Sequence, residues 1–306
     1  MTTVAPKSDL GRAIHDLFMN ISGWALLIFV VVEVLLIAVV FAFRDRPGRA
    51  EPRPVYGHLG LEIAWTLVPV IIVVSITVPT IATIFKTDYP RPPQGALSIE
   101  VTGHQWWWEI RYPELGITTA NELHLPVGRP VSLSLKSADV IHSFWIPRLG
   151  GKRDLVPGKV NSLIFTVDTP GDYPGQCAEF CGLSHANMRL LVVAQSTPDF
   201  ESWAGRLKNP PTPPSGQAAK GLQAFLAAGC VACHAIQGVA FGVVGPNLTH
   251  VGSRKTLAAG ILKNTPEDLS TWLRDPPRIK PGALMPKLPM TDDQLSALVA
   301  YLRNLK

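Results

Sequence analysis

Charged side chains are scarce in this sequence. They make up 17% of the 306 residues, whereas hydrophobic residues make up 47%. So low a charged fraction is typical of a chain that lies partly in lipid. Two apolar runs explain it: residues 21–43 contain one charge, Glu33, and residues 63–85 contain none. Each run can cross a hydrocarbon core of about 30 Å as a helix, so we expect a transmembrane hairpin rather than two buried helices of a soluble protein.

The first 20 residues lack the basic start, short apolar run and small-residue cleavage site of a secretory signal. Either the sequence is already mature or its first span directs insertion. Residues 44–53 hold four arginines against two acids, and positive charge near helix ends tends to stay in the cytoplasm. We therefore expect an integral protein of the bacterial inner membrane, with both termini and the soluble part on the periplasmic side.

A proline-rich break, NPPTPPSG at 209–216, reads as a stiff linker. It divides the chain into an N-terminal segment and hairpin (1–85), a middle domain (86–208) and a last domain (217–306). Between 96 and 195 the sequence lacks a helical period and shows short alternating runs broken by proline and glycine, which predicts a β-sandwich or barrel. The whole formal charge of +5 belongs to the last domain.

Only four cysteines are present, and two of them fall in the stretch GQCAEFCGLSHANM at 175–188. That stretch and the preceding run DVIHSFW supply two thiols, two imidazoles and one thioether, from Cys177, Cys181, His142, His185 and Met188. Such a soft set suits copper, as in cupredoxins, whereas a structural zinc site would not use the methionine. A short-range disulfide is the alternative, and it would leave both histidines and the methionine unexplained.

The other two cysteines lie in CVACH, residues 230–234, which is a heme-attachment motif. Cys230 and Cys233 would add to the porphyrin vinyl groups and His234 would ligate the iron. A lone motif of this kind also occurs in redox and zinc sites. Here it follows the amphipathic run GLQAFLAAG, and the chain ends in a helical pattern with Asp at its start and Lys and Arg at its end.

The runs DVIHSFWIPRLGGKRDLVPG and YPGQCAEFCGLSHANMR closely resemble cytochrome c oxidase subunit II, and the hairpin and GHQWWWE (103–109) fit the same family. The resemblance covers roughly residues 14–195 and implies a cupredoxin-like domain with a dinuclear copper centre, CuA. Its ligands would be two bridging sulfurs, two histidines, a weak methionine and a backbone carbonyl, from Cys177, Cys181, His142, His185, Met188 and Glu179 respectively. Quinol oxidase subunits share the hairpin but lack these cysteines, so the resemblance excludes them.

The same resemblance implies roles for three further side chains. Trp106 would be the residue at which electrons enter; on a strand it would share a face with Trp108. The Glu179 side chain would bind magnesium or manganese at the contact with subunit I. Glu62 would lie at the mouth of a proton path, although an ordinary interfacial carboxylate is the simpler alternative.

Residues 217–306 resemble class I cytochrome c, an all-α domain. The resemblance makes Met285, in ALMP, the sixth iron ligand, with Met290 as the competitor. It gives Trp272 a hydrogen bond to a heme propionate, against simple core packing. It also places the first helix against the last, through Gly221, Phe225, Leu298 and Tyr301.

Together these features predict subunit II of a terminal heme–copper oxidase with a fused cytochrome c, the caa-type arrangement. Electrons would pass from heme c to CuA and then to subunit I, which holds heme a and copper, reduces oxygen and pumps protons. This chain would be enzymatic only within that complex. Expected partners are subunit I, other oxidase subunits, membrane lipid and an external donor such as a cytochrome c or cytochrome bc complex, but no nucleic acid. The alternatives are a subunit of a nitric oxide reductase and a membrane-anchored carrier without a catalytic partner.

Overall fold

The computed structural model describes residues 2–48, 54–87 and 92–306, which form two compact units. One unit comprises residues 12–90 and the other comprises residues 1–11 and 91–306. Part of the arginine-rich loop on which the orientation was predicted, 49–53, lies outside the described residues.

Two long apolar helices, α1 (Asp9–Phe43) from residue 12 onward and α2 (Leu59–Thr87), make up most of the first unit. Among the described residues they are the two helices long and apolar enough to cross a membrane. Both begin before the predicted spans at 21 and 63. α1 begins early because Ser8 caps it: the Ser8 hydroxyl accepts a hydrogen bond from the Gly11 backbone N–H at 2.9 Å. Hydropathy marks the stretch that fits lipid, whereas the cap decides where the helix begins.

Residues before α1 belong to the second unit. The Lys7 N–H donates to the Arg148 carbonyl at 2.8 Å, and the Asp168 N–H donates to the Lys7 carbonyl at 2.9 Å. Sequence reasoning grouped this segment with the hairpin in 1–85. The difference arises because its partners lie some 140 residues away, where no local pattern reveals them.

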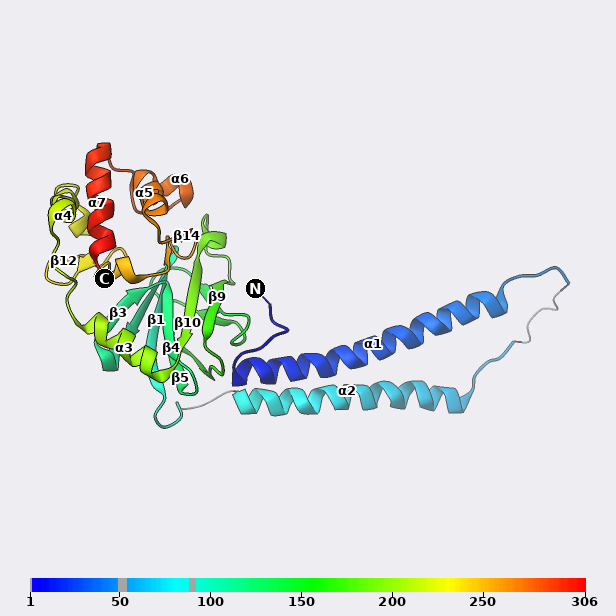
Figure 1. Cartoon of the computed structure of the whole chain (residues 1–306). Coiled ribbons are helices and arrows are strands. Elements are labelled where there is room, and N and C mark those ends of the chain that lie inside the picture. Colours follow the sequence, from blue (N-terminus) through cyan, green and yellow to red (C-terminus); the bar gives the residue numbers. More distant parts are fainter. Residues whose placement is uncertain (1, 49–53, 88–91) are drawn as a thin grey trace. The chain divides into compact units, whose positions relative to one another are not determined.

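The middle of the chain forms a β-sandwich, as predicted (Figure 1). One sheet has the order β3-β2-β1-β5-β8, with bounds Ile117–Ala120, Trp107–Tyr112, Leu97–His104, Pro130–Ser137 and Asn161–Thr166. The other has the order β4-β10-β9-β6-β7, with bounds Glu122–Pro126, Arg189–Gln195, Gly171–Cys177, His142–Trp145 and Arg153–Leu155. Burial alternates strictly along β1, because every second side chain of a strand faces the sandwich interior.

Strand pairing brings the cysteine-rich segment to one end of the second sheet. β9 ends at Cys177 and β10 begins at Arg189, so the residues between them form a loop. Cys177 pairs with Phe144 of β6, two residues after His142. The register therefore places the distant histidine beside this loop.

Helix α3 (Thr197–Lys208) follows the sandwich and was not predicted. Its N-cap is Ser196, whose hydroxyl accepts the Asp199 N–H at 3.3 Å. Phe200 and Trp203 are buried in the sandwich core, and Trp203 stacks on His124 with ring centroids 4.3 Å apart. The Ser196 cap, with a proline in the first turn, was the local signal for this helix.

The last domain is helical, with α4 (Gly216–Ala227), α5 (Pro266–Arg274), α6 (Pro276–Ile279) and α7 (Asp292–Asn304). Two small hairpins, β11–β12 and β13–β14, span Ala235–Ile236 with Ala240–Phe241 and Thr256–Leu257 with Leu262–Lys263. The predicted contact between first and last helix is confirmed. A Cβ on Gly221 would lie 2.0 Å from the Ala297 carbonyl oxygen, and the Phe225 and Tyr301 rings meet at 5.7 Å.

Candidate metal and cofactor sites

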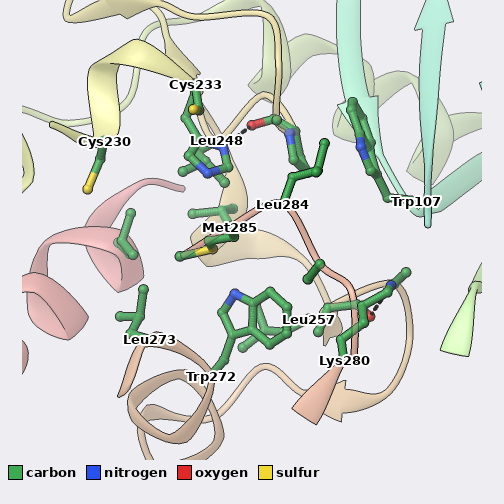
Figure 2. A pocket seen from close by; sticks show the side chains of 18 of the residues that line it. Trp107, Cys230, Cys233, Leu248, Leu257, Trp272, Leu273, Lys280, Leu284 and Met285 are labelled. Carbon is green, nitrogen blue, oxygen red and sulfur yellow. Dashed lines mark hydrogen bonds between the residues drawn. The ribbon is translucent and has the colours of Figure 1, made fainter. Parts of the chain in front are cut away.

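A cavity of about 340 Å³ opens in the last domain (Figure 2). Its size falls in the range of small-molecule and cofactor pockets. The predicted heme residues line it together, namely Cys230, Cys233, His234, Trp272 and Met285. Trp106 and Trp107 of the β-sandwich line it as well, so the two soluble domains share its wall.

His234 is oriented for metal binding. Its Nδ1 lies 2.8 Å from the Pro246 carbonyl oxygen, and because a carbonyl only accepts, Nδ1 carries the proton and Nε2 keeps its lone pair. Burial lowers the pKa of His234, which favours the neutral, ligating form. Gly245 packs on the ring, where a Cβ would lie 2.6 Å from Cε1.

The structure distinguishes the two candidate methionines. Met285 lines the cavity, whereas Met290 packs against the apolar cluster of the domain and is absent from the cavity wall within the described residues. Figure 2 shows the Met285 and Trp272 side chains in this cavity together with Cys233. This placement supports Met285 as the iron ligand.

Sequence reasoning missed Arg254, which also lines the cavity. Its Nε is shielded from solvent and has no hydrogen-bond partner within the described part of the chain. Burial lowers the pKa of Arg254 to about 10, against the opposing charge of Glu122. An unpaired guanidinium N–H in a cavity wall fits an anionic group such as a carboxylate. Arg254 stands in the polar stretch SRKT, so no local signal in the sequence marks its burial.

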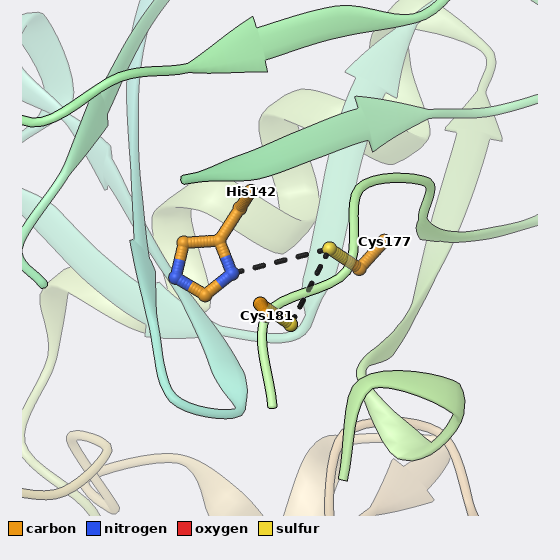
Figure 3. Close-up of side chains that lie close together, drawn as sticks. All are labelled: His142, Cys177 and Cys181. Atoms are coloured by element: carbon orange, nitrogen blue, oxygen red, sulfur yellow. Dashed lines mark hydrogen bonds between the residues drawn. The ribbon is translucent and has the colours of Figure 1, made fainter. Parts of the chain in front are cut away.

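The second site is the loop between β9 and β10. Cys177 Sγ lies 3.9 Å from His142 Nδ1 and 3.8 Å from Cys181 Sγ (Figure 3). Both cysteines and His142 are buried. Disulfide sulfurs are about 2.05 Å apart, so the cysteines are free thiols and the disulfide alternative does not hold in the structure.

The remaining predicted ligands complete this group. Cys181 Sγ lies 3.5 Å from His185 Nδ1 and 3.9 Å from Met188 Sδ. Cys177 Sγ lies 3.3 Å from the Glu179 carbonyl oxygen. Metal–sulfur bonds of about 2.3 Å allow one ion to reach both sulfurs across 3.8 Å. The donor set is soft, its three sulfur side chains and His142 are buried, and it fits copper.

Charge is distributed unevenly over the two thiols. The hydrogen bond from Cys181 lowers the pKa of Cys177 and at the same time raises the pKa of Cys181. Burial opposes the charged form of His142, but its contacts with Cys177 and Asp139 outweigh burial and raise the pKa of His142. Asp139 Oδ1 lies 2.7 Å from His142 Nε2, and a second partner of this kind orients a ligating ring.

Trp106 lies in a two-residue turn, which corrects the prediction that it lies on a strand. His104 pairs with Trp107 across the hairpin, so Gln105 and Trp106 form the turn. The Trp106 Nε1 donates to the Cys181 carbonyl at 2.8 Å, and Gln105 Nε2, which sequence reasoning missed, donates to the same oxygen at 2.8 Å. Trp106 thus directly contacts the loop between β9 and β10 (residues 178–188, the copper loop).

The neighbouring tryptophans pack against other aromatic rings of the sandwich. Trp108 is fully buried and meets the Phe144 ring edge-on at 5.4 Å. Trp107 stacks on His104 with ring centroids 4.3 Å apart.

The two glutamates proposed for partner contacts are exposed. Glu179 directs its carbonyl toward Cys177, while its side chain faces solvent. Glu62 lies in the first turn of α2. Neither side chain joins a metal-binding group within the described residues, so a role for either depends on a partner.

The fold and these sites define a membrane-anchored electron-transfer protein with a cupredoxin-like domain and a cytochrome c domain. Residues 5–83 match the family described as cytochrome c oxidase subunit II, transmembrane domain, and residues 115–195 match its periplasmic domain. Residues 218–306 match the cytochrome c family.

Full-length relatives agree with these matches. The chain is 38% identical to cytochrome c oxidase subunit 2 of Alkalihalophilus pseudofirmus, covering 100% of this chain and 91% of the relative. It is 34% identical to cytochrome c oxidase subunit 2 of Bacillus subtilis, and the match covers 100% of this chain and 92% of the relative. The chain belongs to the cytochrome c oxidase subunit II family, in the form with a fused C-terminal cytochrome c.

Two further comparisons cover less of the chain. A quinol oxidase subunit 2 of Bacillus subtilis is 33% identical over 67% of this chain and 65% of its own length. The solved periplasmic domain of oxidase subunit II of Bradyrhizobium japonicum is 31% identical, covering 39% of this chain and 97% of that chain with a TM-score of 0.37.

Membership has several consequences. The family is a subunit of cytochrome c oxidase, so the chain is a component of an oxidoreductase complex. The family implies copper and the cytochrome c domain implies heme c. The protein is anchored in the membrane and carries a periplasmic domain.

Proposed function

We propose that electrons enter a terminal cytochrome c oxidase through this chain and cross it from heme c to a dinuclear CuA centre. They then leave for the heme of subunit I, where oxygen is reduced to water and protons are pumped. When bound, the heme iron and the coppers supply one-electron redox chemistry. The chain itself binds, orients and shields these groups.

The position of Trp106 carries this proposal. Its side chain lines the cavity of the last domain and donates a hydrogen bond to the carbonyl of Cys181 in the copper loop. Trp106 is 7% exposed, so its side chain is largely shielded from water. One buried aromatic residue therefore bridges the two sites.

The candidate ligands divide between the two groups as follows. Copper would be held by two thiolates, two imidazoles, a thioether and one backbone carbonyl, from Cys177, Cys181, His142, His185, Met188 and Glu179. Heme would be held through the sulfurs of Cys230 and Cys233, and its iron by His234 and Met285. Trp272 and Arg254 face the same cavity, and there they would bind the propionates.

Contacts with partners complete the proposal. The exposed Glu179 side chain would hold magnesium or manganese against subunit I, and Glu62 would lie at the mouth of a proton path. The soluble domains and both termini would be periplasmic, and residues 1–11, which group with the β-sandwich, support that placement of the N-terminus. A basic last domain favours an acidic external donor, such as a cytochrome c or a bc complex, or anionic lipid. The fusion replaces a diffusing donor by a tethered one, which raises its effective concentration.

The test uses the intact complex purified from native membranes through this chain. We expect cyanide-sensitive oxygen uptake when an electron donor is supplied. Nitric oxide turnover with little oxygen uptake would assign the complex to the reductases instead. Purification without any catalytic partner would reduce the function to electron carriage.

A further inference from the structure

Lys280 is a buried lysine at the contact between the two soluble domains. It lies five residues before Met285 and is only 4% exposed. Its Nζ donates to the Trp106 carbonyl at 2.5 Å and to the Ala258 carbonyl at 3.2 Å. Figure 2 shows the Lys280 side chain at the wall of the cavity. One side chain of the cytochrome domain therefore holds the backbone of the turn that presents Trp106.

Burying the Lys280 amine in this contact costs free energy. Burial lowers the pKa of Lys280 to about 7, while the charge of Cys181 opposes the shift. None of the lysine salt bridges in the described ranges involves Lys280, so backbone carbonyls are its partners. A buried amine without a carboxylate gives little net stability. Protonated or neutral, it keeps N–H donors, so the contact with Trp106 persists in both forms.

The residues after Lys280 continue the same contact. Ser184 of the copper loop donates its hydroxyl to the Pro281 carbonyl at 2.6 Å. Gly282, at φ +82°, lies so close to the Trp106 ring that a Cβ would come within 2.7 Å of it. Only a residue without a side chain fits there in this conformation. Segment 280–282 is therefore pressed against Trp106 and the copper loop.

We propose that Lys280 is a positioning residue for electron transfer between the two domains. By holding the Trp106 backbone it fixes the segment that leads to Met285 against the tryptophan and the copper loop. The inference rests on the proposed transfer from heme c to CuA. In that transfer, Lys280 is the residue that fixes how the heme segment and the copper loop lie relative to each other.

The same interface offers a matched control. Lys255 Nζ lies 2.7 Å from Asp172 Oδ1, also between the cytochrome domain and the sandwich, but both side chains are about half exposed. An exposed ion pair contributes little to stability or geometry. Lys255→Met therefore removes a lysine of this interface that does not touch Trp106.

The experiment compares Lys280→Met, Lys280→Arg and Lys255→Met in the purified complex. A photoexcited dye reduces heme c, and absorbance follows the electron to copper. Visible spectra establish that heme and copper are bound, and hydrogen exchange of residues 280–286 reports whether the segment remains held. We expect Lys280→Met to slow transfer severalfold, well outside the margin allowed to the control, because the contact that the electron must cross is loosened, and to speed exchange. Lys280→Arg should recover most of the rate, and Lys255→Met should keep it within about twofold.

Each outcome supports or overturns the positioning role of Lys280 or the proposed function. A Lys280→Met rate equal to the parent, with both cofactors bound, overturns the positioning role. So does a variant that fails to take up heme, because Lys280 would then support folding of the domain. If the parent complex shows no transfer from heme to copper, the proposed function itself fails.

Discussion

The candidate copper ligands contact one another at 3.3 to 3.9 Å, whereas the candidate heme ligands stand around a cavity of about 340 Å³. The copper loop is held at both ends by paired strands, β9 and β10, and its sulfurs are already buried. The heme domain instead keeps a space that its own side chains do not fill. We therefore expect that the sandwich arranges the copper loop, whereas the cytochrome domain depends on its cofactor to complete its core.

The largest effect should follow from removing the heme attachment. In the full chain carrying both Cys230→Ser and Cys233→Ser, we expect heme to be lost on denaturing gels. The free energy of unfolding of the helical domain should fall by about 2.7 kcal/mol or more, which is the stabilisation that a ligand gives at a hundred times its Kd. Circular dichroism of the chain in detergent measures this.

Cys177→Ser is the matched change in the copper loop. It should abolish copper binding but leave the unfolding of the sandwich nearly unchanged, since strand pairing holds the loop. Equal losses of stability in both domains would remove the proposed difference between them.

A second experiment separates ligand from packing within the heme domain. Met285→Ala should abolish the low-spin His/Met spectrum, because it removes the proposed sixth ligand. Met290→Ala should keep that spectrum and cost about 2 kcal/mol of stability as a truncated apolar side chain. Loss of the spectrum in Met290→Ala alone would reverse the assignment.

The copper loop permits a finer change. Met188→Leu conserves volume and should cost less than about 1.5 kcal/mol, so copper should remain bound. Because the thioether tunes such a site, we expect an altered redox potential and visible spectrum. An unchanged spectrum would exclude Met188 from the copper site.

A last prediction concerns the interface that joins the two regions. Glu122 of β4 accepts hydrogen bonds from the Thr256 N–H at 2.7 Å and hydroxyl at 2.9 Å. Burial alone would raise the pKa of Glu122, but hydrogen bonds from His124, Lys255 and Thr256 outweigh it and lower the pKa. The stabilisation is therefore present above the unfolded carboxyl pKa and is lost as the pH falls through the lower folded value.

Glu122→Gln should destabilise the docked domains by about 1.5–3 kcal/mol at pH 7. The difference from the parent should shrink below about pH 4, and denaturant unfolding at several pH values measures it. A difference independent of pH would mean that the carboxylate charge does not contribute.

Much of this protein could be read from local patterns. Two long apolar runs predicted the hairpin, and alternating apolar and polar residues predicted the sandwich. The spacing of the cysteines and histidines indicated Cys177, Cys181 and the CVACH motif as cofactor sites. Helix α3 was missed although Ser196 caps it. The strand position expected for Trp106 was wrong. His104 pairs with Trp107, so the two residues between them form the turn of a hairpin and do not continue the strand.

By itself the sequence determined which side chains gather at each site, because metal-binding chemistry requires particular residue types at short spacings. Only the tertiary structure decided how the sites meet. Lys280 reaches Trp106 across 174 positions and Thr256 reaches Glu122 across 134. Such contacts depend on how whole domains pack, and packing leaves no periodic trace in the chain. Arg254 and Lys280 look like ordinary surface charges until the fold buries their nitrogen atoms.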